Sequence, residues 1–353
     1  MSITEYYVLG VMSGTSLDGI DIAYLHFKKE ERWTYKIILG ETIPYTTNWA
    51  TKLQKAVHYN SSELKNLNTN YTTLLAEVIN GFIKKHQLEN IDAVCSHGHT
   101  ILHQPEKGVT LQIGNLEHLS DMLQQKVVCD FRVQDVALGG QGAPLVPIGD
   151  ELLFSEFEYC LNLGGFSNIS TQKNNQRIAY DICPVNIVLN HYVQQLGKPY
   201  DDGGEIAASG QIDVELLEKL NSLKFYQLDF PKSLGLEWVQ EIIFPLIDVF
   251  NLSVPDILRT FVEHCAIQIS KQFLSKGNVL ITGGGMYNSF LMNRIKALSD
   301  NSIHMPDSNL IEFKEALIFG FLGVLKLRDE VNVLASVTGA KKNHSSGVVF
   351  NCK

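Results

Sequence analysis

A run of glycine, hydroxyl and acidic residues near the start of the chain has the composition of a phosphate-binding loop. It reads Gly14-Thr15-Ser16-Leu17-Asp18-Gly19 and continues into Ile20-Asp21. Because glycine has no Cβ, backbone N–H groups can approach a phosphate closely there, and the hydroxyls of Thr15 and Ser16 add donors. The carboxylate of Asp18 could hold Mg²⁺ directly or through water. A plain hairpin turn, which also favours Gly and Asp, is the alternative.

Two further glycine runs could also contact phosphates or a nucleotide. Gly164-Gly165 precedes Ser167 and Asn168, and Gly283-Gly284-Gly285 separates an apolar stretch from a helix-like one. Each is compatible with an ordinary turn. The late run would let a nucleotide lie against bare backbone near a helix N-terminus, but it is not G-x-G-x-x-G, so a dinucleotide fold is not indicated. The order of the three runs is that of the parts of an actin-like ATPase cleft, in which two lobes clamp the nucleotide.

Asp181 is placed where a general base could work. It follows the extended stretch 177–180 and precedes Cys183-Pro184. We therefore expect it at a strand end, where a carboxylate that faces a cleft is suited to proton abstraction. A solvated turn aspartate is the alternative.

Three histidines, His97, His99 and His103, suggest a different chemistry. On an extended segment, H-x-H spacing places both imidazoles on one side, where the pair could bind Zn²⁺. The alternative is hydrogen-bonding histidines in a cleft or loop, because no third and fourth ligands are evident. A zinc hydrolase would be built on His97, His99 and Asp130.

Hydrophobic patterning predicts two α/β lobes that would position these residues. In the first lobe we expect strands at 6–11, 20–27, 33–43 and 91–96 and helical structure at 48–86. In the second we expect strands at 159–163, 166–171 and 278–282 and a helix at 288–298. Each lobe opens with a glycine-turn hairpin, which hints at internal duplication. We place lobe I at 1–130 plus 333–353 and lobe II at 131–332, with the Gly/Pro-rich segment 139–147 in or near the cleft.

Composition narrows the function classes. The 353 residues are 45% hydrophobic and 19% charged, as in ordinary globular enzymes. The formal net charge of −9 argues against a nucleic-acid partner, which favours a basic face. No apolar run is long enough to span a membrane, and Met1–Gly10 lacks the features of a secretion signal. Six cysteines without a C-x-x-C pair predict a reduced, cytoplasmic protein.

Taken together, these stretches resemble the anhydro-N-acetylmuramic acid kinases. The matching segments run in order through nearly the whole chain: VLGVMSGTSLDGIDIAY (8–24), SHGHTI (96–101), LQIGN (111–115), FRVQDVALGGQGAPLVP (131–147), LNLGGFSNIS (161–170), YDICPVN (180–186), LGKPYDDGGEIAASG (196–210), LITGGGMYN (280–288) and SVTGA (336–340). The MSGTSLDG and GGQGAPLVP stretches are highly specific.

The resemblance implies a fold, a reaction and a set of site residues. The fold would be α/β, with a two-lobed actin/hexokinase-like (ribonuclease H-like) ATPase architecture and a central cleft, in a homodimer. The reaction would convert the amino sugar 1,6-anhydro-N-acetylmuramic acid, with ATP, Mg²⁺ and water, into N-acetylmuramic acid 6-phosphate and ADP during cell-wall recycling. Asp181 would activate the water, and Glu315, which precedes Ala316, would orient the site. ATP would contact residues 14–21, Gly164, Gly165, Asn168, Gly283, Gly284 and Gly285, and the sugar would contact Thr100, Arg132 and Asp181.

The chain departs from the family pattern in three places. The family's D-T-G-P-G-N reads Asp181-Ile182-Cys183-Pro184-Val185-Asn186, so two glycines are replaced. The family's H-G-Q-T reads His97-Gly98-His99-Thr100, and a histidine that is usual after the V-P stretch is replaced by Gly149-Asp150. A non-catalytic sugar sensor on the same fold is a further alternative, but the intact Asp181 and the intact loop 14–19 argue against it, because a sensor needs neither.

Overall fold

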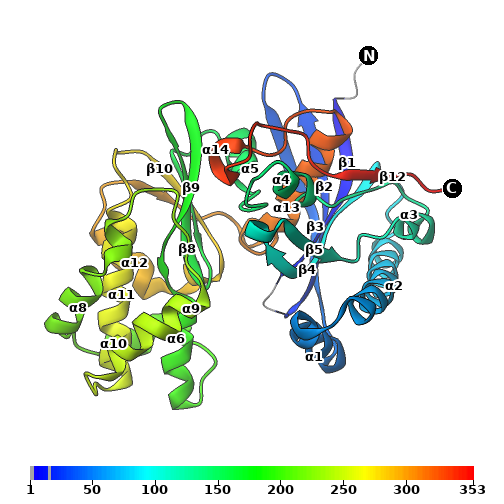
Figure 1. The fold of residues 1–353 in the computed structure, drawn as a ribbon. Coiled ribbons are helices and arrows are strands. Elements are labelled where there is room, and N and C mark those ends of the chain that lie inside the picture. The colour runs from blue at the N-terminus through cyan, green and yellow to red at the C-terminus, as the bar shows by residue number, and fades with distance from the viewer. Residues whose placement is uncertain (1–3, 15–16) are drawn as a thin grey trace. The chain divides into compact units, whose positions relative to one another are not determined.

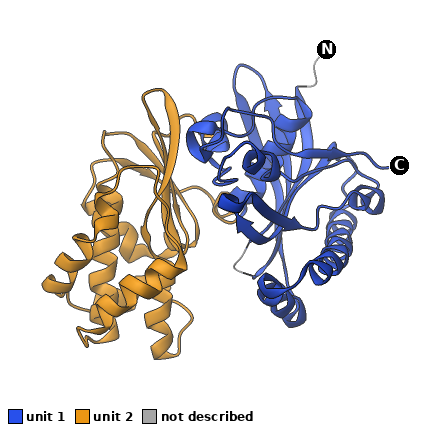
Figure 2. Cartoon of the chain, in the orientation of Figure 1, with its two compact units in different colours: residues 1–153, 313–353 blue, residues 154–312 orange. Residues whose placement is uncertain are grey.

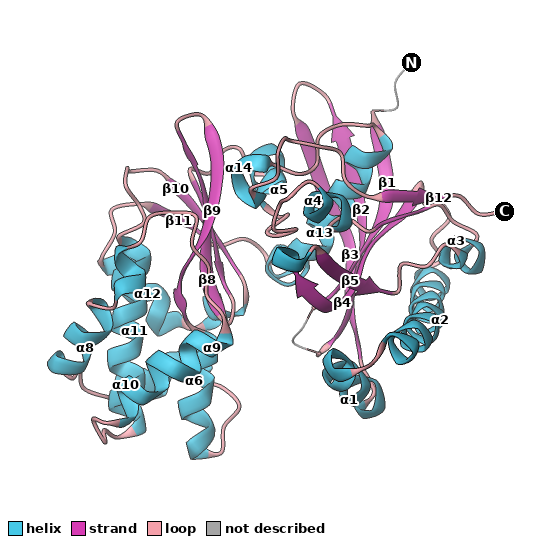
Figure 3. Cartoon of the chain, viewed as in Figure 1, coloured by secondary structure: helices cyan, strands magenta, loops and turns pink. Residues whose placement is uncertain are grey.

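The chain forms two compact units in the computed structural model, which describes residues 4–14 and 17–353. Unit 1 comprises residues 1–153 and 313–353, and unit 2 comprises residues 154–312 (Figure 2). Each unit is built from one β-sheet and several helices (Figure 3). Thr15 and Ser16 of the predicted phosphate loop lie outside the described residues.

The division between the units lies at 153 and 312 rather than near 130 and 332, where the sequence analysis placed it. Helix α5 (Pro147–Leu153) and most of helix α13 (Ser308–Leu327) stay with unit 1 because they pack on each other. A Cβ at Gly149 would collide with Ile318, and Lys314 Nζ lies 2.8 Å from Asp150 Oδ1 in a buried ion pair. These contacts were not visible in the local sequence pattern.

The sheet of unit 1 has seven strands among the described residues (Figure 1). They are β1 (Glu5–Ser13), β2 (Gly19–Lys29), β3 (Trp33–Pro44), β4 (Ala93–Gln104), β5 (Val109–Ile113), β6 (Val127–Cys129) and β12 (Val348–Phe350). Their order is β12-β6-β4-β1-β2-β3, with β5 paired to β4. Strands β1, β2 and β3 form an antiparallel meander, whereas β4 runs parallel to both β1 and β6.

The sheet of unit 2 repeats this arrangement with five strands. They are β7 (Tyr159–Leu163), β8 (Phe166–Lys173), β9 (Gln176–Pro184), β10 (Asn278–Thr282) and β11 (Ser302–His304), in the order β11-β10-β7-β8-β9. Again three strands form an antiparallel meander, and two more add in parallel beside its first strand. The shared order and directions are those of a ribonuclease H-like fold, so the predicted α/β class and the predicted internal duplication are confirmed.

Helices cover both faces of the first sheet. In unit 1 they are α1 (Thr47–Lys55), α2 (Ser61–His86), α3 (His118–Leu123), α4 (Val133–Ala137), α5, the larger part of α13, and α14 (Ala335–Thr338). Leu9 and Val11 of β1 belong to the core beneath α2, whereas Gly10 touches α13 on the other face. Because both faces are buried, β1 reads as a nearly continuous apolar run rather than an alternating one.

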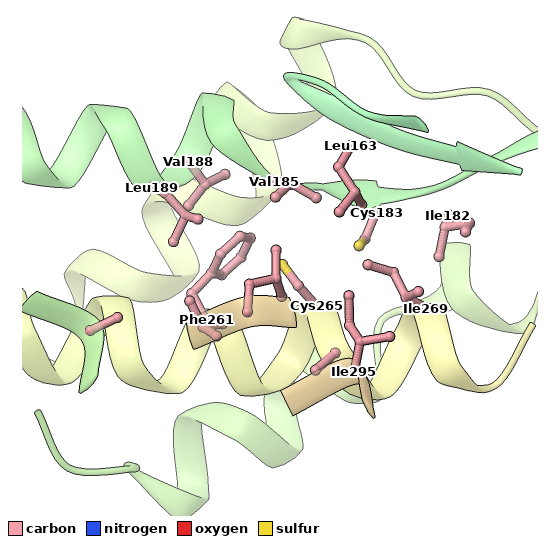
Figure 4. Close-up of a cluster of buried hydrophobic side chains, with 14 of the residues drawn as sticks. Leu163, Ile182, Cys183, Val185, Val188, Leu189, Phe261, Cys265, Ile269 and Ile295 are labelled. Carbon is pink, nitrogen blue, oxygen red and sulfur yellow. The ribbon is translucent and has the colours of Figure 1, made fainter. Parts of the chain in front are cut away.

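The second sheet packs on a single large hydrophobic core. Its helices are α6 (Asn186–Val193), α7 (Glu205–Ser209), α8 (Val214–Asn221), α9 (Leu236–Trp238), α10 (Phe244–Asp248), α11 (Val254–Ser270) and α12 (Ser289–Ala297). Figure 4 shows Phe261, Cys265 and Ile269 of α11 against Leu163 of β7 and Cys183 of β9. These contacts hold the apolar face of β9 against the core.

The predicted helical stretch 48–86 forms two helices rather than one. The break lies at Tyr59 and Asn60, where Asn60 caps α2: its side chain accepts hydrogen bonds from the backbone N–H groups of Ser62 and Glu63, and Glu63 accepts one from the backbone N–H of Asn60. This reciprocal arrangement satisfies donors that a helix start otherwise leaves open.

Short helical turns complete the structure. The 3₁₀ segments are Ala56–His58, Pro105–Lys107, Gln194–Leu196, Asp202–Gly204, Lys224–Gln227 and Gly284–Tyr287, and Val239–Ile243 forms a π-helical turn. None of the helices in residues 4–14 and 17–353 has the length and apolar character needed to cross a membrane.

The contact between β1 and α13 can be tested with one methyl group. A Cβ at Gly10 would collide with the backbone carbonyl of Ala316, so we expect Gly10→Ala to lower the free energy of unfolding by on the order of 3 kcal/mol, the upper range for overpacking. Gly81→Ala is the matched control, because Gly81 is exposed on α2 with nothing within 4 Å of an added Cβ. It should stabilise the protein by about 0.5–1 kcal/mol. Urea denaturation followed by circular dichroism gives both values, and equal stability of Gly10→Ala and wild type would contradict the close packing.

Candidate active site

The predicted phosphate loop connects β1 to β2 in unit 1. The chain turns at Leu17, whose φ is +62°, and the backbone N–H of Leu17 donates to the carbonyl of Gly14 at 3.4 Å. Asp18 has an exposed side chain, while its backbone carbonyl accepts a hydrogen bond from Tyr45 N at 3.2 Å. A Cβ at Gly19 would lie 2.5 Å from the carbonyl oxygen of Ile43, so packing against β3 already requires this glycine.

A buried row of polar side chains supports the base of this hairpin. Ser13 Oγ lies 2.8 Å from His99 Nδ1 and also bonds the hydroxyl of Tyr45, which bonds the hydroxyl of Tyr71 on α2. Burial raises the pKa of both tyrosines, so both stay protonated hydroxyls at neutral pH. Burial also lowers the pKa of His99 to about 4, so this histidine is neutral. The loop therefore stands on a fixed, uncharged hydrogen-bonded base.

The zinc hypothesis is wrong in its geometry, because His97 and His99 point to opposite faces of β4. Gly98 between them has a φ of +73°, and the pairing of β4 with β1 shifts register there. His97 consequently packs on Phe319 of α13, with 4.5 Å between ring centroids, whereas His99 packs on Tyr71 of α2 at 5.9 Å. Within residues 4–14 and 17–353, no group of three or more potential metal ligands occurs. Asp130 is instead held by Asn115, whose Nδ2 donates to it at 2.9 Å.

Arg132, the predicted sugar contact, is clamped by neighbouring groups in unit 1. Its Nε donates to His97 Nε2 at 2.8 Å, and its Nη1 donates to the carbonyl of Gly142 at 2.7 Å. Burial lowers the pKa of Arg132 to about 10, while the charges of Glu315 and Asp135 oppose that shift, so the guanidinium remains a cation at neutral pH.

Glu315 and Asp21 lie within electrostatic range of each other, and Arg132 acts on Glu315 as well. The side chain of Glu315 is accessible to solvent, yet the protein atoms around it desolvate the carboxylate and raise its pKa. Arg132 lowers that pKa, Asp21 raises it and Lys314 lowers it. The structure thus gathers three predicted site residues that are far apart in the sequence. Thr100 of β4, which is also a predicted sugar contact, accepts a hydrogen bond from Gln112 Nε2 at 3.3 Å.

Unit 2 aligns four polar residues across its sheet. The register pairs Thr282 with Asn162, Asn162 with Asn168, and Asn168 with Asp181. Residues paired directly across strands carry their side chains on the same face. Asp181 therefore ends a polar row that crosses β10, β7, β8 and β9, on the face opposite the core residue Ile169.

Asp181 lies inside β9, not at its end as the sequence suggested, because the strand runs on to Pro184. The register shift between Asn168 and Ser167 leaves Ile182 as an extra residue, and such bulges re-aim neighbouring side chains. Backbone groups of residues 232–234 then hold Asp181: its N–H donates to Lys232 O at 3.1 Å, and Leu234 N donates to its Oδ2 at 2.8 Å. Burial raises the pKa of Asp181 and the hydrogen bond from Leu234 lowers it, with burial the larger effect.

The glycines of the two predicted nucleotide-binding runs in unit 2 differ in whether the fold itself requires them. Gly283 has a φ of +88°, and a Cβ at Gly285 would lie 2.9 Å from Leu163 Cβ, so the fold itself requires both. By contrast, Gly165 and Gly284 are exposed, and an added Cβ would meet Ile187 only at 3.9 Å or nothing within 4 Å, respectively. Gly164 is intermediate, with Asn162 Nδ2 at 3.3 Å. A ligand that approaches the backbone would explain why Gly165 and Gly284 lack side chains.

The helix predicted at 288–298 after the glycine run is confirmed as α12 (Ser289–Ala297). A 3₁₀ turn, Gly284–Tyr287, intervenes, and α12 starts at Ser289 with Asn288 as its cap, whose Oδ1 accepts from Leu291 N at 2.9 Å. The side chain of Asn288 therefore satisfies one of the backbone N–H groups that the helix start leaves open.

Two of the three departures from the family pattern place buried residues that contribute to packing. Ile182, Cys183 and Val185 are buried in the core of unit 2, and none has a positive φ, so residues larger than glycine fit there. Asp150 forms the buried ion pair with Lys314 described above.

Sequence reasoning missed four contributors: Ser13, Asn162, Leu234 and His97 in its bond to Arg132. Leu234 acts through its backbone N–H, which no residue type can reveal. His97 and Arg132 lie 35 positions apart, so only the fold joins them. For Asn162 a signal existed, because it directly precedes Leu163 and the glycine pair.

Comparison with solved structures gives distant likenesses. The component A of (R)-2-hydroxyglutaryl-CoA dehydratase from Acidaminococcus fermentans aligns with a TM-score of 0.48 and 13% identity, over 92% of this chain and 99% of that one. A ROK hexokinase from Thermus thermophilus aligns with a TM-score of 0.40 and 11% identity, over 90% and 99%.

Sequence comparison is more specific. A family model described as anhydro-N-acetylmuramic acid kinase matches residues 6–352. The anhydro-N-acetylmuramic acid kinase of Pseudomonas syringae pv. tomato is 33% identical, covering 98% of this chain and 99% of that protein. The one from Mannheimia succiniciproducens is 35% identical, covering 98% and 99%. These matches, which span nearly the whole chain, show that the chain belongs to the anhydro-N-acetylmuramic acid kinase family.

Proposed function

We propose that this protein converts 1,6-anhydro-N-acetylmuramic acid, ATP and water into N-acetylmuramic acid 6-phosphate and ADP, as a cytoplasmic homodimer in cell-wall sugar recycling. The observation that carries the proposal is the environment of Asp181: a carboxylate of raised pKa, aimed by a β-bulge and held by backbone groups, in a chain of this family. A raised pKa suits a general base that must work near neutral pH.

The proposed nucleotide contacts lie in the three glycine-containing segments. Residues 14–21 of unit 1 would bind phosphates, with Thr15 and Ser16 as hydroxyl donors, and Gly164, Gly165 and Asn168 of unit 2 would add donors. Gly283, Gly284 and Gly285 would contact adenosine. Support comes from Gly165 and Gly284, where neither packing nor backbone conformation demands glycine. Gly19, Gly283 and Gly285 are already explained by close packing, so their part in binding would be secondary.

Asp18 is the proposed magnesium residue. Its side chain is exposed beside the hairpin, and a carboxylate is the donor type that Mg²⁺ prefers, so the residue fits the ion. Bound there with ATP, Mg²⁺ would neutralise charge on the phosphates.

The reaction requires one bond exchange at the sugar and one at phosphorus. Asp181 takes a proton from water, and the water oxygen bonds to the anomeric carbon as the bond from that carbon to O6 breaks. O6 then bonds to the γ-phosphorus, and the bond from that phosphorus to the β–γ bridging oxygen breaks to release ADP. Water should enter opposite the departing O6, as in inverting glycosidases.

The unit 1 residues would bind and orient the sugar. The guanidinium of Arg132 provides a fork of donors for an anion or hydroxyl. Thr100 would offer a hydroxyl. Glu315 would orient the site, supported by its accessible carboxylate and by the charges of Arg132 and Asp21 around it.

Removal of the base is the first test. Asp181→Asn keeps the size of the side chain but removes its basicity, so kcat should fall by at least roughly 10²-fold while ATP binding persists. Steady-state turnover and calorimetric titration with ATP measure the two effects. Near-normal turnover in Asp181→Asn would show that another group is the base.

The pH profile provides a second test. The base must be ionised, so kcat should fall as the pH drops through the raised pKa of Asp181. Leu234→Pro removes the N–H that stabilises the carboxylate. The pKa should rise further, and the acid limb of the kcat profile should move to higher pH. Leu234→Ala retains the N–H and should keep the wild-type limb. If the acid limb of the kcat profile does not move in a folded Leu234→Pro protein, Asp181 is not the group that accepts the proton.

Isotope labelling tests the coupled chemistry. In ¹⁸O-water, the label should appear on the anomeric hydroxyl of the product and not on its phosphate, because water attacks carbon and O6 attacks phosphorus. Mass spectrometry of the product locates the label. Label on phosphate would indicate ATP hydrolysis instead.

A further inference from the structure

His97 is a buried histidine to which the proposed mechanism assigns no role. Its ring packs on Phe319 of α13, and its Nε2 lies 2.8 Å from Arg132 Nε. The inference drawn from it rests on the proposed function, because it concerns how Arg132 meets the sugar.

The partners of His97 fix its tautomer and its charge. Arg132 Nε carries a hydrogen, so His97 Nε2 must accept, and the distance is 2.8 Å. His97 Nδ1 lies 2.9 Å from the carbonyl of Gly98, which can only accept, so Nδ1 must carry the proton. Only the neutral ring can do both. Burial, reinforced by the charge of Arg132, lowers the pKa of His97 well below its usual value.

A second clamp reaches the guanidinium from the other side. Arg132 Nη1 donates to Gly142 O at 2.7 Å, and Gly142 N donates to Asp135 Oδ2 at 2.7 Å. Asp135 is fully buried, and its Oδ1 accepts from Thr338 Oγ1 at 2.7 Å. Two of the five guanidinium N–H groups are therefore used. Within the described part of the chain, the Nη2 hydrogens have no protein partner in hydrogen-bonding range.

We propose that His97 is a positioning residue that, with the Asp135–Gly142 clamp, presents the remaining N–H donors of Arg132 to the carboxylate of the muramic acid substrate. A carboxylate accepts two parallel hydrogen bonds from a guanidinium. An arginine whose side chain is already ordered loses less conformational entropy when it makes them. His97 must be a neutral acceptor, because a protonated ring would repel the cation and could not accept from Nε.

The test is a double-mutant cycle read out on sugar affinity. His97→Leu removes the acceptor, and the KM for 1,6-anhydro-N-acetylmuramic acid should rise about 10-fold or more, the scale of losing a hydrogen bond to a charged group. The KM for ATP should stay unchanged. His97→Gln offers an amide oxygen as acceptor and should restore the sugar KM to within about 3-fold of wild type. In an Arg132→Ala background, His97→Leu should have no further effect, since its only route to the sugar is gone.

His97→Asn, which is polar but too short to reach Arg132, replaces His97→Leu if thermal melting shows that the leucine variant is unfolded. Additive effects of the His97 and Arg132 substitutions on sugar KM, or equal losses for sugar and ATP, would overturn the proposal. The failure of the proposed function can be distinguished from the failure of the His97 proposal. Absence of turnover of the bridged sugar by the wild-type protein refutes the proposed function. An active wild-type protein in which the His97 and Arg132 substitutions have additive effects on sugar KM refutes only the role of His97.

Discussion

The close contact between β1 and α13 is the constraint on which unit 1 depends. Gly10 meets the backbone of Ala316, and Gly320 and Gly323 leave room for Leu25 and Cys95 of the sheet. A helix that lies this near a sheet has little freedom to slide or rotate, because core packing is dense. Glu315 precedes the contact point, and Phe319 follows one helical turn later. The position of one backbone contact therefore sets both the carboxylate of Glu315 and the aromatic surface on which His97 rests.

In unit 2 the corresponding constraint is strand register. Three consecutive pairings place Thr282, Asn162, Asn168 and Asp181 on one face. A shift by one residue in any pairing would turn its strand over and bury the polar groups. The apolar residues of β9, Ile182 and Cys183, lock that register into the core. The larger residues that stand at the positions of the family's glycines, Cys183 and Val185, therefore add core packing beside the proposed base.

The sequence predicted those parts of the fold that rest on local pattern. The two hairpins and the buried strands follow from residue types within a few positions. The strand position of Asp181 and the unit boundaries differ from expectation, because both depend on contacts between distant segments. The histidine pair shows this most clearly. Alternation predicted one shared side for His97 and His99, but the positive φ of Gly98 reverses it. The identity of the sugar substrate rested on the family resemblance rather than on composition or spacing, whereas residue types also indicated the phosphate loop and the basic role of Asp181.

The account's central claim is that phosphoryl transfer is coupled to opening of the anhydro bridge. A coupled ADP-release assay that compares 1,6-anhydro-N-acetylmuramic acid with N-acetylmuramic acid tests it most directly. We expect ADP release that depends on the bridged sugar and yields one ADP per sugar consumed, with the unbridged sugar a poor substrate, because it has no bridge for Asp181 to help open. Equally efficient use of N-acetylmuramic acid would contradict the account and make the protein a plain hexose-type kinase.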